Sequence, residues 1–339
     1  MDRLKPSLVR QLFTLMLILF FMVLILKELI PYLTGILGAI TFYVILRGWM
    51  RRLTKKGWSP VVAGSYLIGL SFVGILVPTF LIILLVSSKL GDLVSNLDRL
   101  IGVIKAEIRE AESYFGYNLS ESIDTSRITN WLSTNLQSIG EGTFNAFIAI
   151  GIMYFMLYYM LIYQKEMKRL LISYIPMTRQ NLQRIGREGR EMVRSNALGI
   201  PLVAFFQGLV ALIGYLIVGV NDPLFWFVIT AVGAMVPFIG TALAIVPLTI
   251  LLYSQDMIWQ AIFIVIYGIT IVGVTDNLLR IYILNRLSAV HPLITLFGVV
   301  VGVPLFGFIG LIFGPLLVSL FLLILKIYRQ EYGNSQEKI

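Results

Sequence analysis

The chain has 339 residues, of which 58% are apolar and 13% charged, and its net charge is +9. Soluble domains average about 45–50% apolar and about 25% charged residues, so this composition argues against an ordinary soluble core. The chain has no cysteine and a single histidine, His291, which excludes a disulfide scaffold, a cysteine zinc site and any multi-histidine metal site. The composition predicts an all-α polytopic membrane bundle, and we expect no cofactor and no metal.

Stretches free of Asp, Glu, Lys and Arg mark the candidate membrane spans, because a helix needs about 20 apolar residues to cross a bilayer. Eight such runs predict about eight transmembrane helices. They lie at residues 11–26, 29–46, 57–88, 142–164, 195–221, 223–255, 257–275 and 287–325. The runs of 32, 33 and 39 residues exceed one straight crossing, since 39 residues would extend roughly 58 Å at about 1.5 Å per residue. Such a run is a protruding helix, a kinked helix, or two shorter helices joined inside the membrane.

The first two runs, 11–26 and 29–46, are separated by Lys27 and Glu28 alone. No small-residue cleavage pattern follows the first run, so it does not match a secretory signal. We expect an uncleaved transmembrane hairpin with the two charged residues at its tip. Residues 1–86 then form a unit of this hairpin and a third span.

Basic loops predict the orientation. Segment 47–58 has five Lys or Arg and no acid, segment 164–194 has eight basic and three acidic residues, and segment 87–141 has five basic and eight acidic residues. The positive-inside rule places both termini and the two basic segments in the cytoplasm, and 87–141 outside. Segments 223–255 and 287–325 can each cross the membrane once or form a membrane hairpin. The distribution of basic residues in the loops slightly favours hairpins.

Two segments outside the spans have amphipathic patterns. Apolar residues recur every three or four positions along 87–141, which predicts a mostly helical extracytoplasmic unit. Segment 164–194 is a basic connector broken at Pro176, and its charge suits anionic lipid headgroups rather than nucleic acid. It belongs to a C-terminal transmembrane transport core at 142–339.

Proline and glycine interrupt two of the long apolar runs. Backbone leaves the helix at membrane depth where it is buried in protein or lines a cavity, and transporters use such breaks as substrate and ion sites. The fragments at 237–247 and 307–315 look alike, which suggests an internal repeat. The candidate pathway residues in these runs are Pro237, Gly240, Thr241, Pro247, Gly302, Pro304, Gly310 and Pro315. Ordinary kinks and small-residue helix packing are the alternative interpretation.

Polar residues gather just before the last long run, at Asp276, Asn277, Arg280 and His291. Ionisable groups at membrane depth are costly and usually functional. On a helix, Asp276 and Arg280 share a face and can pair, because they are four residues apart. The carboxylate can bind a cation or carry a proton, and the imidazole can titrate near neutral pH. The alternative is an interfacial loop with a local salt bridge.

Several signatures are absent from the sequence. It contains no GxxxxGK[ST], HExxH or GxSxG motif, which argues against an ATP-driven pump and the common membrane proteases. We therefore expect that the protein is not an enzyme.

Residues 275–321 resemble the C-terminal signature of the autoinducer-2 exporter family, a group of bacterial membrane permeases. The signature runs from Asp-Asn and a basic residue through His-Pro to a glycine-rich stretch ending in proline. The matching positions are Asp276, Asn277, Arg280, His291, Pro292, Gly302, Gly307, Gly310, Gly314 and Pro315. Segment 236–247 is similar to the family's other motif. The resemblance implies about eight spans, a bacterial inner (cytoplasmic) membrane location and homo-oligomers, with pentamers suggested.

The resemblance also implies export of a small solute. Substrates suggested for the family are autoinducer-2 and, for some members, Na⁺ or Li⁺ exchanged for protons. We expect a secondary transporter working by alternating access, in which Asp276 carries the ion or proton, Asn277 and Arg280 shape the site, and His291 tunes its pH dependence. Expected partners are a small-molecule or cation substrate, membrane lipid and further copies of the chain. The alternative is a membrane scaffold or accessory subunit that binds a partner through 87–141.

Overall fold

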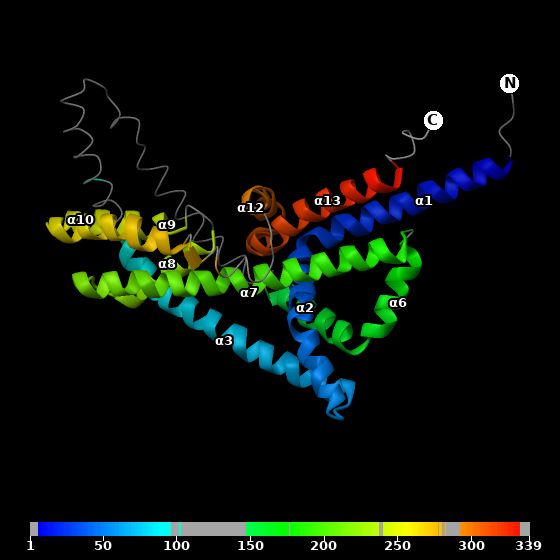
Figure 1. Ribbon diagram of the computed structural model, residues 1–339, viewed down its shortest axis with the longest axis horizontal. Helices are drawn as coiled ribbons and strands as arrows, with labels where there is room; N and C mark the ends of the chain where they lie inside the picture. Colours follow the sequence, from blue (N-terminus) through cyan, green and yellow to red (C-terminus); the bar gives the residue numbers. More distant parts are fainter. Residues whose placement is uncertain are drawn as a thin grey trace, which may run out of the picture.

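The computed structural model describes residues 6–95, 102, 147–175, 177–236, 240–276, 278–279, 282 and 292–332. All regular structure in these residues is helical (Figure 1). The elements are α1 (Pro6–Leu29), η1 (Ile30–Tyr32), α2 (Leu33–Lys55), α3 (Pro60–Ser95), a helix at Phe147–Ile162, α6 (Gln164–Tyr174), α7 (Arg179–Val218), α8 (Pro223–Ala234), α9 (Ala242–Ser254), α10 (Ile258–Tyr267), η3 (Gly268–Val272), α12 (Pro292–Phe306), η4 (Gly307–Ile309) and α13 (Gly310–Tyr332).

Five helical stretches in the described residues are long and apolar enough to cross a membrane. They are Arg10–Lys55, Pro60–Val86, Arg179–Val218, Ile258–Asp276 and Gly310–Gln330. A sixth arises if Phe147–Ile162 and α6 form one span, although these helices meet at 91°. The chain is therefore an all-α, multi-pass membrane bundle, as the composition predicts. The eight charge-free runs do not correspond one to one with crossings, because α8, α9 and α12 are short apolar helices.

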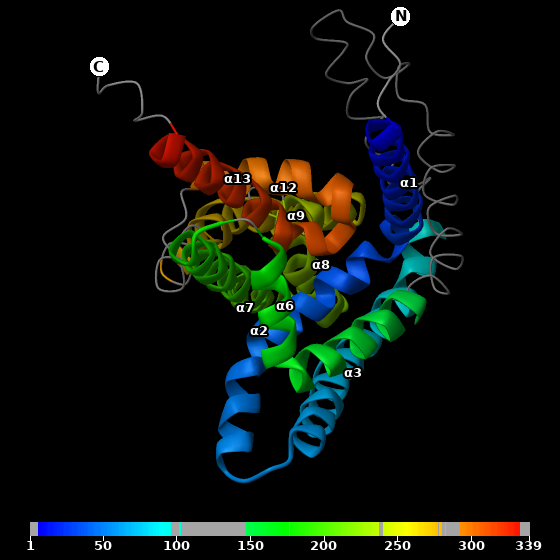
Figure 2. The ribbon, with the colours of Figure 1, turned by 90° about the vertical axis from the view of Figure 1, so that its right-hand side faces the viewer.

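The first two runs form α1 and α2, which η1 joins end to end. The large apolar side chains of α1 are between 41% and 62% exposed, and α1 stands clear of the other helices in Figure 2. The structure thus differs from the expected hairpin of two helices packed on each other. The short 3₁₀ turn does not fold α1 back along α2.

The expected basic connector 164–194 is divided between two helices. α6 and α7 lie on either side of Pro176, where the sequence predicts a break. The Thr178 hydroxyl caps α7 by accepting a 3.4 Å hydrogen bond from the Asn181 N–H, and Gly219 ends the helix with a φ of 71°. α7 has 40 residues, about 60 Å at 1.5 Å per residue, so its basic first half continues directly into an apolar span.

α7 is the central helix of the bundle. α2, α8, α10, η3 and α13 all contact it, and it runs along the length of the molecule in Figure 1. Its buried face follows the helical period, as expected for a helix packed against several neighbours. The buried residues are Met192, Val193, Ser195, Asn196, Gly199, Ile200, Val203, Ala204, Gln207, Gly208, Ala211, Gly214, Tyr215 and Val218. Polar side chains therefore lie inside an otherwise apolar interface.

The two long runs whose form the sequence leaves open are both broken pairs of helices. α8 and α9 contact each other, and so do α12 and α13. A Cβ at Gly302 would lie 2.5 Å from the Gly314 Cα, and a Cβ at Gly233 or Gly240 would collide with the other residue's carbonyl oxygen. Glycine is required at these positions because the two backbones of each pair touch directly.

The expected extracytoplasmic segment 87–141 falls mostly outside the described residues. α3 extends to Ser95, beyond the expected end of the third span at residue 86. Apart from residue 102, the segment after Ser95 is not described until residue 147.

Candidate functional site

Asp276 lies at the end of the span Ile258–Asp276 and is 9% exposed. Among the described side chains it is the single acidic or basic group buried to this degree. Asp276 is thus packed among helices, unlike a residue of an open loop, and its place at membrane depth stays a prediction. Asp276 is therefore the natural starting point for a site.

A π-helical turn, η3, precedes Asp276 in the same span. The Gly273 N–H donates to the Gly268 carbonyl, a separation of five residues instead of the usual four. π-turns inside α-helices are rare and frequently lie at functional sites. The extra residue turns the following segment, so η3 decides which side of the helix Asp276 occupies.

Asp276 lines a small cavity together with residues from two other parts of the chain. The six lining residues are Gln207, Ala234, Val236, Gly240, Thr241 and Asp276. Three of them, Gly240, Thr241 and Asp276, are candidates from the sequence. The sequence shows no link between Asp276 and the other two residues. Among the six, Asp276 is the one titratable side chain. The tertiary structure brings the carboxylate to the break between α8 and α9.

The ends of two short helices meet at this cavity. α8 ends at Ala234, and the chain then turns so that the Gly240 N–H donates to the Val236 carbonyl at 3.1 Å. α9 begins after Thr241, whose side chain makes no capping hydrogen bond. Carbonyls are free at a helix C-terminus and N–H groups at an N-terminus. The cavity thus lies between the C-terminus of α8 and the N-terminus of α9, as sites do at the broken helices of transporters.

Gln207 reaches the cavity from α7, and the sequence analysis did not single it out. Its side chain is 1% exposed, and its Oε1 atom has no hydrogen-bond partner within the described part of the chain. Buried polar groups normally find a partner, so this oxygen calls for an explanation. A glutamine in the charge-free run 195–221 is the signal that could have identified it.

The cavity is small. Its volume is about 10 Å³. This is about the least volume that holds one water molecule. In the conformation described, the cavity therefore fits one water or one dehydrated small cation.

The second break lies against the first one. Met235 and Val236, at the end of α8, pack on Ile200 of α7, Val299 of α12 and Leu311 of α13. The two proline- and glycine-rich stretches identified in the sequence therefore meet around α7. A movement of α12 and α13 would be transmitted to the wall of the Asp276 cavity through these contacts.

Five sequence candidates do not line the cavity. Gly302 and Gly310 lie in the contact between α12 and α13, and Pro315 is fully buried in α13. Pro304 is exposed in α12, and Pro247 is half-buried inside α9. Their observed role is to shape and pack the broken helices.

Four further candidates lie outside the described residues. These are Pro237, Asn277, Arg280 and His291. Their expected roles at the site stay predictions.

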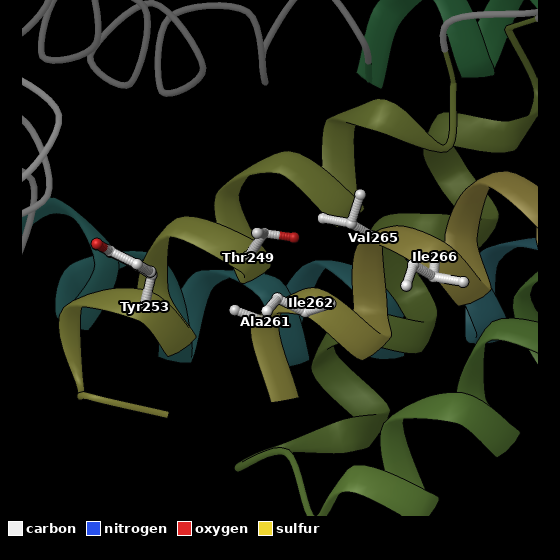
Figure 3. A pocket seen from close by; sticks show the side chains of 6 residues that line it. All are labelled: Thr249, Tyr253, Ala261, Ile262, Val265 and Ile266. Carbon is white, nitrogen blue, oxygen red and sulfur yellow. The ribbon is translucent and has the colours of Figure 1, made fainter. Parts of the chain in front are cut away.

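A second cavity lies between α9 and α10 and is shown in Figure 3. Its volume is about 230 Å³. Its lining is mostly apolar and consists of Thr249, Tyr253, Ala261, Ile262, Val265 and Ile266. Ile262 and Ile266 are both 56% exposed, so this is an open apolar groove on the flank of the bundle. It lacks a charged group that could bind an ion.

No group of three or more His, Cys, Asp or Glu side chains in the described ranges could hold a metal ion. A single carboxylate with neutral oxygens is instead the donor set available at the Asp276 cavity.

Comparison with known proteins places the chain among transport proteins. A family model described as AI-2E family transporter matches residues 13–330. Proteins named “Putative transport protein” are similar over most of their length. One from Aquifex aeolicus is 26% identical over 327 residues, covering 88% of this chain and 91% of that protein. One from Helicobacter pylori strain J99 is 22% identical over 292 residues, covering 78% of this chain and 80% of that protein.

Proposed function

Because this chain belongs to the AI-2E transporter family and is a multi-pass membrane transport protein, we propose that it exchanges Na⁺ or Li⁺ for protons at the Asp276 cavity. Asp276 is the carrier: its carboxylate holds either the cation or a proton. Alternating access around the two broken helix pairs delivers this site to each side of the membrane in turn.

The observation that carries the proposal is the burial of Asp276 beside the α8–α9 break. Carboxylates within membrane spans commonly mark ion pathways and proton relays. A carboxylate can bind a small cation or a proton, so one buried side chain is suited to exchanging the two. The carbonyl-bearing end of α8 at the same cavity supports cation binding, because carbonyl oxygens replace the hydration shell of a cation.

Cavity size favours cation exchange over the export of a solute similar to autoinducer-2. A space of about 10 Å³ accommodates one dehydrated ion or one water in this conformation. An organic solute would require the broken helices to separate first. Such a solute is therefore the second candidate substrate.

We also propose the orientation that the charge pattern predicts, with both termini and the basic segments in the cytoplasm. Assembly into homo-oligomers stays part of this proposal.

The direct test uses purified protein in liposomes that contain a trapped pH dye. An imposed Na⁺ or Li⁺ gradient is expected to drive proton movement, and Asp276→Asn is expected to abolish it, because the amide neither binds a proton nor neutralises a cation. Asp256→Asn is the matched control. Asp256 is exposed in the turn before α10, and its φ of 59° suits asparagine, so this variant should transport normally.

Cation-driven proton flux that survives in Asp276→Asn would overturn the role of Asp276. Absence of cation-driven flux in the wild-type protein would overturn cation exchange. In that case, uptake of an organic solute into inverted vesicles would separate solute export from a scaffold that acts through 87–141.

A further inference from the structure

Gln207 lines the same cavity as Asp276. Its side chain is 1% exposed, and its Oε1 atom accepts no hydrogen bond within the described part of the chain. We infer that Gln207 Oε1 is a ligand of the transported monovalent cation and, with the Asp276 carboxylate, makes the cavity selective for a small dehydrated ion. This inference rests on the function proposed above.

The energetics of burial favour a ligand over a structural residue. A buried carbonyl oxygen without a donor loses its hydration and receives nothing in return. An apolar side chain of similar size would fill the position without that loss, and the neighbouring positions Val203, Ala204 and Ala211 on the same face of α7 are apolar. The Gln207 oxygen accepts no hydrogen bond among the described residues, and a bound cation would supply the partner that it lacks.

The chemistry of the lining fits a small alkali cation. Hard cations prefer oxygen ligands, and neutral carbonyl oxygens combine with one carboxylate to balance a single positive charge. Gln207 Oε1 approaches from α7, Asp276 from the end of the π-containing span, and Gly240 and Thr241 from the α8–α9 break. Three separate elements therefore enclose one position, so their relative movement would change the cation affinity.

Gln207 also connects the cavity to the rest of the bundle. It shares the buried face of α7 with Ile200, on which the end of α8 and the α12–α13 pair are packed. A ligand on this helix is held by the scaffold, whereas Gly240 and Thr241 belong to a break. The ion thereby bridges a fixed helix and a broken pair.

The chain supplies a matched control in Gln260. Its Oε1 is also buried without a hydrogen-bond partner among the described residues, but it lies on α10 and does not line the cavity. Sixteen residues separate it from Asp276, about 24 Å along a helix at 1.5 Å per residue. Gln260→Leu therefore shows the effect of removing a buried glutamine amide at a position where we expect no bound ion.

The experiment measures binding of radioactive Na⁺ to the purified full-length protein, with Li⁺ as competitor, alongside proton movement in liposomes. Gln207→Leu is expected to weaken Na⁺ binding at least tenfold, whereas Gln260→Leu leaves it within twofold of wild type. Gln207→Met, which is close in length and shape but lacks the carbonyl oxygen, is expected to weaken binding in the same way. Thermal unfolding of each variant checks that the fold is intact.

The outcomes separate this inference from the function on which it rests. Wild-type Na⁺ affinity in a folded Gln207→Leu, with binding lost in Asp276→Asn, overturns the role of Gln207 and leaves the exchanger proposal standing. No Na⁺ binding by the wild-type protein overturns both. If Gln207→Leu does not fold, Na⁺ affinity in Gln207→Met decides, and wild-type affinity there overturns the ligand role.

Discussion

The side-chain amide of Asn196 donates a 3.2 Å hydrogen bond to the backbone carbonyl of Ile312, and this bond joins α7 to α13. Ile312 lies three residues before Pro315, in the turn where the missing proline N–H removes one helical hydrogen bond. Asn196 and Gln207 lie eleven residues apart, about three helical turns, so they lie on one face of α7. One face of α7 thus contacts both broken helix pairs, α12–α13 through Asn196 and α8–α9 through Gln207.

Loss of this hydrogen bond is expected to destabilise the helix contact. Asn196→Ala removes a donor that is 5% exposed and leaves the Ile312 carbonyl without it, which should lower the free energy of unfolding by about 1–2 kcal/mol. Thermal unfolding in detergent measures the change. Asn221→Ala, in the exposed turn before α8, is the control and should stay within about 0.5 kcal/mol of wild type. Equal stability of the two variants would contradict the structural role.

The glycine contact between α12 and α13 is expected to tolerate no added methyl group. A Cβ at Gly302 would lie 2.6 Å from the Gly310 carbonyl oxygen, so Gly302→Ala forces the two backbones apart and should cost about 1–3 kcal/mol. Gly69→Ala in α3 meets nothing within 4 Å and should be neutral or stabilising by about 0.5–1 kcal/mol. Chemical denaturation of the two proteins gives the comparison, and a stabilised Gly302→Ala would refute the close approach.

The helical phase that η3 gives Asp276 is expected to be necessary for the site. Insertion of one alanine directly after η3, between Val272 and Gly273, adds about 100° of helical rotation and should turn Asp276 away from the cavity. Cation-driven proton flux in liposomes should then be lost while the protein remains folded. Thr270→Val, at an exposed position within η3, keeps the length and should transport normally. Normal flux in the insertion variant would show that the phase of the helix after η3 does not position Asp276.

A buried hydroxyl pair holds α7 against α8. Tyr215 and Thr230 lie 2.7 Å apart between their oxygens, and the Thr230 hydroxyl donates to the Trp226 carbonyl. Because a hydroxyl has one hydrogen to donate, Tyr215 is the donor in this pair. Tyr215→Phe should lower the free energy of unfolding by about 1 kcal/mol.

The control for this change is Tyr174→Phe. Tyr174 is 83% exposed at the end of α6 and should leave stability unchanged. Calorimetry of both variants distinguishes a lost hydrogen bond from a general effect of removing a tyrosine hydroxyl. If Tyr215→Phe is as stable as the wild-type protein, the hydrogen bond between Tyr215 and Thr230 does not stabilise the fold.

The sequence by itself determined the class of this protein and made Asp276 a candidate for its site. Long charge-free runs exclude a water-soluble core because their apolar surface needs lipid or protein around it. Proline and glycine inside those runs marked where the helices break, since proline cannot donate a backbone hydrogen bond and two backbones approach closely at glycine. The sequence left open whether each run is one kinked helix or two helices. Asp276 was identifiable because a charge beside an apolar span is costly.

Tertiary structure alone decided which of these features meet. Gln207 gives no periodic signal, and its proximity to Asp276 depends on how α7 packs against the α8–α9 break and on the register that η3 imposes. The same holds for α1, whose end-to-end joint to α2 depends on a short turn that charge counting does not detect. Spans follow from local hydrophobicity, whereas a site follows from contacts between segments far apart in the chain, and such contacts are fixed when the helices pack.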